Sequence, residues 1–428
     1  MLVGKKVRKV AIVGGNRIPF ARSNTALFGC SNQEMLTAAL SGLVDRFKLK
    51  GEQLGEVAGG AVMKHSRDFN LVRESVLSSG LAAETPAYDI QQACGTGLEA
   101  AILVANKIAL GQIDSAIACG VDTTSDAPIG VNEEKRKVFM SINKAKTTGE
   151  KAKLAIKLLN PKWFMPDIPK NGEPRTGLSM GEHQAITAAE WGIPRDEQDQ
   201  LAWASHHNLA KSYEDGWQDD LVTPFNGLER DNNMRGDSTI EKLNSLKPVF
   251  GGENGTMTAA NSTPLTDGAS AVLLASEEWA QERGLPVLAY LTFGEAAAID
   301  FVGKKEGLLL APAYAVPRML DKAGLTLQDF DFYEIHEAFA SQVLATLKVW
   351  EDETFCKTRL GRDKALGSID RTKLNVKGSS LAAGHPFAAT GGRIIANAAK
   401  LLNEKGSGRC LISICAAGGQ GVTAILEK

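Results

Sequence analysis

The chain has 428 residues, with 48 Lys and Arg against 50 Asp and Glu and a formal net charge of -2. This near-neutral balance gives no electrostatic basis for binding nucleic acid. A composition of 43% hydrophobic and 23% charged residues is typical of an ordinary globular protein. The length corresponds to roughly three domains' worth of sequence and permits a large core that needs no disulfide bonds.

The cysteines are scattered and form no CxxC pair, which argues against a zinc ribbon and against a disulfide framework. They are Cys30, Cys94, Cys119, Cys356, Cys410 and Cys415. We therefore expect no bound metal and a reducing compartment. No stretch approaches 18 consecutive apolar residues, so no transmembrane helix is predicted. Residues 1–10 are short and basic, contain no signal-peptide h-region with a cleavage site and are too short for a typical transit peptide. We expect a cytoplasmic protein that can associate with membranes.

The first α/β unit along the chain surrounds Cys94. A strand-like run at residues 88–91 leads into a turn that contains this thiol, and residues 98–108 carry apolar side chains at helical spacing. Gly111 ends the helix, and a second strand follows at 115–121. A thiol near the N-terminus of a helix favours the nucleophilic thiolate. The turn therefore predicts covalent acyl transfer, with a small core cysteine as the alternative.

A stretch of different character follows at residues 131–257. Between residues 131 and 175 there are eleven Lys and Arg against five Asp and Glu. Helical patterns begin near residue 184 and again near Arg195, separated by the stop Gly192-Ile193-Pro194. Because this stretch is too apolar to be disordered, we interpret it as an inserted helical lid domain.

A second unit repeats the order strand, turn, helix, strand. Residues 374–376 lead into Gly384-His385-Pro386, a helical pattern runs over 394–402, and a strand is predicted at 410–415. Pro386 is tolerated in a first helical turn, where its missing N–H has no partner. The repeat predicts an α/β fold with two similar halves, although two βαβ units can resemble each other by chance.

We divide the chain into three regions. We assign residues 1–130, completed by 258–280, to the N-terminal half. Residues 131–257 form the inserted loop or lid domain, and residues 281–428 form the C-terminal half. In this arrangement Cys94 and His385 occupy matching turns of the two halves.

Several motifs in order resemble the thiolase family over nearly the whole chain. They are the Cys94 turn, Gly255-Thr256-Met257-Thr258-Ala259-Ala260-Asn261-Ser262, Thr266-Asp267-Gly268-Ala269, His336-Glu337-Ala338-Phe339, Gly384-His385-Pro386 and Cys415-Ala416-Ala417-Gly418-Gly419-Gln420-Gly421. The resemblance implies a thiolase fold, with two α/β halves in a layered αβαβα arrangement and an inserted helical loop domain. It also implies CoA-dependent cleavage of a 3-ketoacyl-CoA, with coenzyme A as a substrate and no further cofactor.

The resemblance assigns a role to each reactive side chain. Cys94 would attack the keto carbon and become acylated, a task that suits a thiol because the product is again a thioester. His385 would accept the proton of Cys94 and later that of the incoming CoA thiol. Cys415 would protonate the departing acetyl-CoA enolate. The backbone N–H groups of Cys94 and Ala417 would stabilise the oxyanion.

The chain departs from the family's pattern at two of these positions. Relatives often carry glycine where this chain has Ala417, and an asparagine that holds a catalytic water stands where this chain has His336. His336 is therefore predicted as a catalytic residue that orients the water and adds a pH dependence, with a core histidine as the alternative. Family positions that line the pantetheine and acyl site correspond to Met180, Thr263 and Phe339.

The motifs around His336 and Cys415 look most like those of the β subunits of the fatty-acid β-oxidation trifunctional complex. That likeness implies a degradative enzyme, at least a homodimer, with a partner α subunit that carries hydratase and hydroxyacyl-CoA dehydrogenase activities. Residues 151–170 interleave lysines with Trp163, Phe164 and aliphatic side chains. Such a basic amphipathic segment predicts peripheral membrane contact or a docking partner, the alternative being a lid helix packed on its own dimer.

Three other activities remain as alternatives. The first is a short-chain acetoacetyl-CoA thiolase that works in the biosynthetic direction. The second is decarboxylative condensation of the ketoacyl synthase type, against which the second thiol, Cys415, argues. The third is a non-catalytic lipid or CoA carrier on the same fold, against which the set Cys94, His385 and Cys415 argues.

Overall fold

The computed structural model describes residues 7–428, and for Lys162 and Phe164 it describes the backbone only. The first six residues, part of the N-terminal segment in which we expect no signal peptide, lie outside the described residues. Across residues 7–428, no helix combines the length and the apolar character needed to cross a bilayer.

Ten strands of the described chain form one continuous sheet. Their bounds are β1 (Val10–Arg17), β2 (Ala21–Arg22), β3 (Glu56–Gly59), β4 (Ala87–Asp89), β5 (Ser115–Asp122), β10 (Thr266–Ser276), β11 (Ala289–Ala298), β12 (Phe332–Ile335), β13 (Arg409–Ala416) and β14 (Gln420–Glu427). The strand order is β12-β13-β14-β11-β1-β10-β5-β3-β4, and β2 pairs with β10. The two halves meet where β1 pairs with β11 through Ala11 and Ile12.

The same pairing pattern occurs in both halves of the sheet. In the N-terminal half, β3 runs parallel to β5, β5 antiparallel to β10, and β10 antiparallel to β1. In the C-terminal half, β12 runs parallel to β13, β13 antiparallel to β14, and β14 antiparallel to β11. The two similar α/β halves predicted from the sequence repeat are therefore confirmed.

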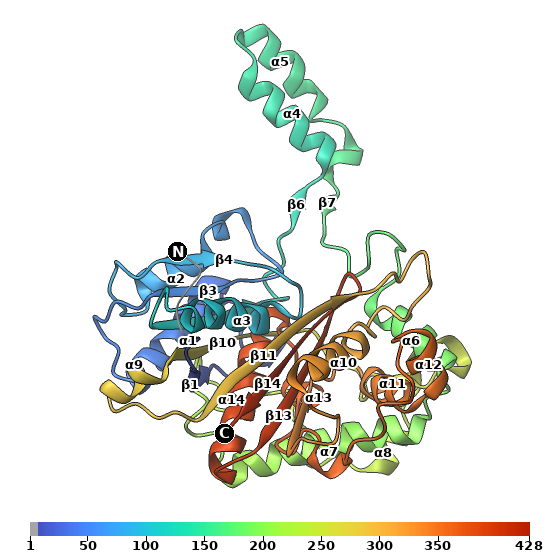
Figure 1. Ribbon diagram of the computed structural model, residues 1–428. Helices are drawn as coiled ribbons and strands as arrows, with labels where there is room; N and C mark the ends of the chain where they lie inside the picture. The colour runs from blue at the N-terminus through green and yellow to red at the C-terminus, as the bar shows by residue number, and fades with distance from the viewer. Residues whose placement is uncertain (1–6) are drawn as a thin grey trace.

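Helices cover the sheet in layers (Figure 1). They are α1 (Asn32–Arg46), α2 (Leu71–Ser78) and α9 (Glu277–Glu282) on the N-terminal half, α10 (Pro312–Ala323), α11 (Ala340–Glu351) and α12 (Glu353–Thr358) on the C-terminal half, and α3 (Thr96–Ala109) and α14 (Thr390–Lys405) between the halves. Three large apolar clusters correspond to these layers, and the middle cluster joins α3 and α14 to strands of both halves. The predicted αβαβα arrangement follows.

The two central helices approach each other closely through glycines. A Cβ on Gly391 would lie 2.2 Å from the backbone N of Leu98, and one on Gly97 would lie 2.6 Å from the carbonyl oxygen of Ala388. No real side chain tolerates such distances, so glycine is required at this crossing. Because α3 begins just after Cys94 and α14 just after His385, the crossing brings the two turns together.

The inserted region divides into two parts. An arm formed by β6 (Gly130–Val131), α4 (Glu133–Lys144), α5 (Thr148–Lys157), the 3₁₀ helix η2 (Pro161–Phe164) and β7 (Pro166–Asp167) projects from the body (Figure 1). The remaining elements pack on the body: α6 (Met180–Glu190), α7 (Arg195–Glu214), α8 (Ile240–Asn244), β8 (Pro248–Phe250) and β9 (Met257–Thr258). The two helices expected after residue 184 are confirmed, while the domain boundaries at 131 and 257 stay predictions.

The strand predicted at residues 374–376 is wrong, because only Leu374 pairs with β12, through an isolated bridge to Tyr333. Asn375 has φ +48, a left-handed conformation that interrupts a strand. Its side chain replaces the missing pairing: the amide oxygen accepts the N–H of Ile335, and the amide nitrogen donates to the carbonyl of Ile335, both at 2.9 Å. The chain then enters α13 (Ser380–Ala383).

Candidate active site

A strained turn presents Cys94 at the start of α3. Ala93 has φ +46, a left-handed conformation that is unfavourable for a residue with a Cβ. The turn is fixed by Thr96, whose hydroxyl donates to the carbonyl of Ala93 at 2.7 Å and accepts the N–H of Gln92 at 2.8 Å. The predicted position of the thiol at a strand-to-helix turn is confirmed, since β4 ends at Asp89 and α3 begins at Thr96.

The ionisation expected for this thiol is wrong. Burial raises the pKa of Cys94 to about 12, despite stabilising hydrogen bonds from backbone N–H groups. Desolvation of the thiolate outweighs the helix N-terminus, because a charged sulfur in an enclosed site loses its hydration. Cys94 is therefore a neutral thiol at rest and becomes nucleophilic only when a base removes its proton.

Two backbone N–H groups surround the Cys94 sulfur. They belong to Cys94 itself and to Ala417, and both lower the pKa of the thiol against the larger effect of burial. These are the two groups that the sequence predicts for the oxyanion hole. The alanine at position 417 does not remove the N–H from the site.

Cys415 lies at the end of β13, one residue before the strand gives way to the turn with Ala417. It is buried, and both this burial and the neighbouring Cys94 thiol raise its pKa well above the usual value. The two thiols thus share one low-dielectric site. Cys119 on β5 and Cys410 on β13 are also buried.

His385 lies in a tight turn that only glycine can precede. Gly384 has φ +99, and a Cβ there would lie 2.4 Å from the side chain of Thr266. The hydroxyl of Thr266 accepts the N–H of His385 at 2.6 Å, and Nδ1 of His385 lies 2.5 Å from the hydroxyl of Thr390. Its Nε2 is buried without a partner among the described residues. Burial, followed by the charge of Arg393, lowers the pKa of His385 to about 3.

His336 packs directly against His385. The ring centroids are 4.1 Å apart, with 42° between the ring planes. The backbone N–H of His336 donates to the carbonyl of Ser413 on β13 at 2.8 Å. This bond holds the His336 backbone beside the strand that also carries Cys415. The Nε2 of His336, like that of His385, is buried without a hydrogen-bond partner in the described chain. The two free ring nitrogens are available to a substrate.

The pH dependence expected from His336 is not supported. Burial lowers its pKa well below the usual value, with further lowering by His385 and Arg393. The ring is therefore neutral near neutral pH, so it can donate or accept a hydrogen bond without changing its charge.

The three predicted substrate contacts lie on the C-terminal side of the site. The N–H and the hydroxyl of Thr263 both donate to the carbonyl of Ala338, at 3.1 and 3.0 Å. Phe339 packs edge-to-face on Phe250, with 6.1 Å between ring centroids. Met180 is the first residue of α6 and packs against the same apolar cluster. The three residues thus line one region, and their contact with a substrate stays a prediction.

Long-range partners that motif reasoning missed hold the catalytic loops. The buried Asp122 accepts N–H groups of Val62 and Met63 from the N-terminal half and of Ala388 from the His385 loop, at 2.8–3.1 Å. Burial raises the pKa of Asp122 to about 7. The side chain of Glu173 accepts the N–H of Gly418 at 2.6 Å. No motif in the sequence marks these residues.

A further set links the His336 loop to α13 and α7. The carboxylate of Glu337 accepts the hydroxyl of Ser205 at 2.8 Å, the amide of Asn375 at 2.7 Å and the N–H of Leu381 at 3.1 Å. Glu337 is therefore held on three sides, and burial raises its pKa. A carboxylate anchored in this way fixes the loop rather than reacting with a ligand.

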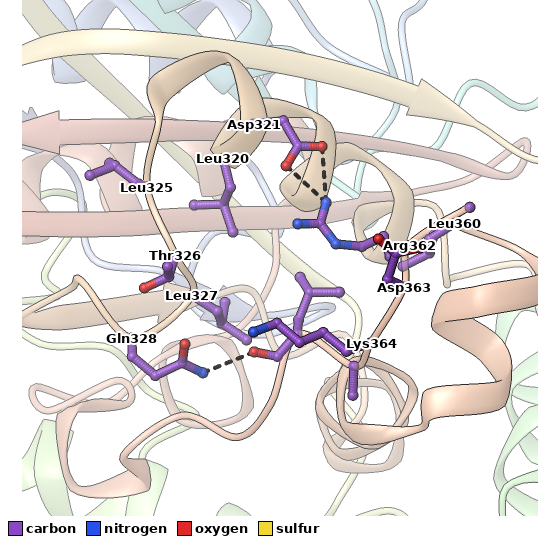
Figure 2. A pocket seen from close by; sticks show the side chains of 13 residues that line it. Leu320, Asp321, Leu325, Thr326, Leu327, Gln328, Leu360, Arg362, Asp363 and Lys364 are labelled. Carbon is purple, nitrogen blue, oxygen red and sulfur yellow. Dashed lines mark hydrogen bonds and ion pairs between the residues drawn. The ribbon is translucent and has the colours of Figure 1, made fainter.

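A separate cavity of about 530 Å³ lies between the end of α10 and residues 360–366 (Figure 2). Arg362 donates to both carboxylate oxygens of Asp321, and the amide of Gln328 donates to the carbonyl of Leu366 at 3.1 Å. None of the predicted site residues lines this cavity. Asp321, Arg362 and Gln328 are held in these contacts, and no cysteine or histidine of the described chain lines the cavity.

Exchange between thioesters requires a thiol, a proton acceptor and N–H donors for a negative oxygen. Cys94, the imidazoles at 336 and 385, and the N–H of Ala417 are groups of these kinds, held at loops that meet between the two halves. The fold and the chemistry of these groups are those of an acyltransferase.

Comparison with known proteins gives the family. The family model of the thiolase N-terminal domain matches residues 10–278, and that of the thiolase C-terminal domain matches residues 287–428. The chain belongs to the thiolase family. It is 40% identical to a 3-ketoacyl-CoA thiolase of Yersinia pestis (strain Pestoides F) over 432 residues, which cover 100% of this chain and 98% of that protein.

Solved structures agree with this family. The acetyl-CoA acetyltransferase of Bacillus anthracis superposes with a TM-score of 0.82 at 28% identity, covering 99% of this chain and 100% of that one. Human mitochondrial 3-ketoacyl-CoA thiolase superposes with a TM-score of 0.80 at 26% identity, with the same coverage. The thiolase fold expected from the sequence is confirmed.

Proposed function

We propose that the chain is a 3-ketoacyl-CoA thiolase of fatty-acid β-oxidation that works through a Cys94 acyl-enzyme. The observation that carries the proposal is the Cys94 thiol, which receives backbone N–H groups from Cys94 and Ala417 and has Cys415 beside it. The Yersinia relative named 3-ketoacyl-CoA thiolase, matched over the whole of this chain, supports the same substrate class.

In the first half-reaction, the sulfur of Cys94 adds to the keto carbon C3 while its proton passes to His385. The N–H groups of Cys94 and Ala417 stabilise the oxyanion. The C2–C3 bond then breaks, which leaves the acyl group on the sulfur and an electron pair on C2 of acetyl-CoA. Cys415 donates a proton to C2, and the proton held by His385 restores the Cys415 thiol. Neutral resting groups suit this sequence, because the two resting thiols hold the protons that the reaction transfers and the uncharged His385 can accept one.

In the second half-reaction, coenzyme A replaces acetyl-CoA and gives its thiol proton to His385. The CoA sulfur attacks the carbonyl of the acyl-enzyme, the bond to Cys94 breaks, and the proton returns from His385 to the Cys94 sulfur. The products are a shortened acyl-CoA and the free enzyme. We place Met180, Thr263 and Phe339 along the path of the pantetheine and acyl groups.

A thiolysis assay tests this function. The wild type should consume 3-ketoacyl-CoA only when coenzyme A is present, and Cys94→Ala should abolish the reaction. Mass spectrometry of the wild type mixed with 3-ketoacyl-CoA without free CoA should show the acyl group on Cys94. Cys119→Ala is the matched control, because it removes a buried thiol of the same half and should keep full activity. No thiolysis of any 3-ketoacyl-CoA by the wild type would refute the proposal.

Chain length separates degradation from biosynthesis. We expect a higher kcat/KM for 3-ketohexadecanoyl-CoA than for acetoacetyl-CoA. The opposite preference would favour the short-chain biosynthetic thiolase. The structural likeness to an acetyl-CoA acetyltransferase supports the short-chain thiolase as a second candidate.

We propose in addition that the arm contacts an anionic membrane surface. Ile156, Leu159 and Met165 on the arm are 66–71% exposed, and lysines accompany them along the same segment. Exposed apolar side chains beside basic ones are typical of surfaces that bind anionic lipids. The arm is not one amphipathic helix over 151–170, because α5 ends at Lys157 and Trp163 donates its indole N–H to Glu134 at 2.7 Å.

Co-sedimentation with phosphatidylserine vesicles tests the membrane proposal. The triple change of Ile156, Leu159 and Met165 to Ser should weaken vesicle binding, and thiolysis of a soluble substrate should not change. Negligible binding of the wild type would refute membrane contact. We also propose a partner α subunit with hydratase and dehydrogenase activities. Affinity capture with that subunit from the same source should retain the wild-type chain, and the arm variant is the control.

We also propose a homodimer or a higher oligomer. Strand β4 lies at one edge of the sheet, with only β3 beside it among the described strands. An edge strand leaves backbone N–H and C=O groups free for pairing, which supports an interface there. Light scattering at the concentration of the assay should give at least twice the mass of one chain, and a monomer would refute this proposal.

A further inference from the structure

Three buried side chains behind the reactive groups form a hydrogen-bonded chain. Arg393 on α14 donates from Nη2 to the hydroxyl oxygen of Ser380 at 2.9 Å. The same hydroxyl oxygen lies 2.7 Å from Nδ1 of His336. All three residues are at most 2% exposed. His336 is far from Ser380 and Arg393 in sequence, so the fold brings the three side chains together.

The donor and acceptor capacities of these groups decide the direction of the last bond. A guanidinium only donates, whereas a hydroxyl has one hydrogen to donate and two lone pairs to accept. Arg393 therefore uses one lone pair of Ser380. If Nδ1 of His336 also donated, the hydroxyl hydrogen of Ser380 would lack an acceptor in a buried site, which is costly. If Ser380 instead donates to Nδ1, its hydroxyl hydrogen has an acceptor.

An acceptor at Nδ1 places the ring proton of neutral His336 on Nε2. That nitrogen is buried, has no partner among the described residues and belongs to the ring that packs 4.1 Å from His385. It is therefore an N–H donor that faces the reaction site with nothing to bind until a substrate or water arrives.

We propose that Ser380 and Arg393 are positioning residues that fix His336 as the Nε2–H tautomer, so that His336 is a permanent hydrogen-bond donor to the oxygen that becomes negative when the C2–C3 bond breaks. This inference rests on the proposed thiolase function for its consequence, but not for its structural part. Where relatives carry an asparagine that orients a water, this chain would thus carry His336, whose N–H donor is fixed through the buried Arg393.

The same contacts distinguish His336 from the neighbouring His385. His385 must present a bare nitrogen to accept a proton, while His336 must present an N–H. Two adjacent imidazoles of identical chemistry would otherwise be free to exchange these roles. The recorded difference between the rings is the arginine: the hydroxyl beside Nδ1 of His336 receives an N–H from Arg393, whereas the hydroxyl beside Nδ1 of His385 belongs to Thr390.

Nitrogen NMR of the ¹⁵N-histidine-labelled protein tests the tautomer directly and requires no activity. The signals of His336 are assigned by their loss in His336→Asn. We expect a protonated Nε2 and a bare Nδ1 in the wild type, with a shift towards the Nδ1–H form in Ser380→Ala. A proton on Nδ1 of His336 in the wild type would overturn the proposal. This measurement also decides the matter if Ser380→Ala fails to fold.

A double-mutant cycle tests the consequence for catalysis. Loss of an oxyanion donor typically lowers a rate by ~10²–10³, so we expect Ser380→Ala to lower kcat/KM about tenfold to a hundredfold. In the His336→Asn background the same change should have little further effect, because its target is gone. Equal losses in both backgrounds would show a merely structural role and refute the proposal.

Ser341→Ala is the matched control. Ser341 lies on α11 in the same half, is equally buried, and its hydroxyl has no hydrogen-bond partner among the residues the structure describes. Its removal should leave the His336 tautomer and the rate of thiolysis unchanged. A wild type that performs no thiolysis would refute the proposed function alone, since the NMR result for His336 stands independently of it.

Discussion

Replacing Glu173 with alanine should slow acylation of Cys94, although Glu173 lies at the base of the arm. Its buried carboxylate accepts the N–H of Gly418 at 2.6 Å, and Gly418 follows the residue whose N–H reaches the Cys94 sulfur. On the other side of the loop, the carbonyl of Gly419 accepts the N–H of Ile299 at 2.8 Å. These two bonds fix the turn, and the variant removes one of them.

The magnitude follows from the type of hydrogen bond. A bond to a charged group contributes ~1.5–3 kcal/mol, and ~1.4 kcal/mol corresponds to a factor of ten. If this energy holds the Ala417 N–H in place, Glu173→Ala should lower the acylation rate about tenfold to a hundredfold. Glu173→Gln retains an acceptor oxygen without the charge, so its loss should be smaller.

The assay is the single-turnover release of acetyl-CoA from 3-ketoacyl-CoA without free coenzyme A, with urea unfolding measured in parallel. Glu190→Ala, an exposed carboxylate at the end of α6, is the control and should match the wild type. Normal acylation by a stably folded Glu173→Ala protein would refute the view that this carboxylate holds the oxyanion loop.

Three further predictions concern ionisation and packing. The single-turnover acylation rate should be flat between pH about 5 and about 8, because the pKa of His385 is lowered to about 3 and that of Cys94 raised to about 12; a limb near the usual histidine pKa would contradict this. Gly391→Ala should lower the free energy of unfolding. The added methyl group overpacks the helix crossing at a cost of ~1–3 kcal/mol, which exceeds the ~1 kcal/mol that alanine gains over glycine in helix propensity. The control Gly149→Ala, with no atom within 4 Å of the added Cβ, should stabilise the protein in the same urea titration. Ala93→Gly should raise the free energy of unfolding by up to ~1 kcal/mol, because glycine relieves the left-handed strain of ~1–2 kcal/mol but is more flexible when unfolded; a loss of stability would show that the methyl group packs usefully.

Much of the fold could be predicted because it repeats. Glycines, apolar spacing and strand-like runs are local signals, and two copies in one chain reinforce each other. The absence of a strand at 374–376 could not be predicted from such signals. There the side chain of Asn375 makes the hydrogen bonds to the backbone of Ile335, and residue spacing does not indicate this contact. The arm was merged with the packed helices for the same reason, because periodicity identifies helices but not what they touch.

The reactive residues were predictable and their environment was not. Motifs fix which residue types occur, so Cys94, His385, His336 and Cys415 could be proposed from sequence. Their ionisation depends on burial, a property of the whole fold, and the thiolate expected at Cys94 was wrong for that reason. Partners such as Glu173, 245 residues from Gly418 along the chain, carry no local signature at all.

Because the resting active site is uncharged, the contacts of supporting residues determine where its reactive groups lie. With Cys94 protonated and His385 uncharged, no ion pair holds the two groups in register before a substrate binds. The negative charge appears only on a substrate oxygen, and only fixed donors can stabilise it without reorganisation. The bond from Glu173 to the Ala417 loop and the chain from Arg393 to His336 each fix one donor in advance. Loosening either should therefore slow the chemical step more than it weakens substrate binding, which a comparison of kcat with KM in the two variants would separate.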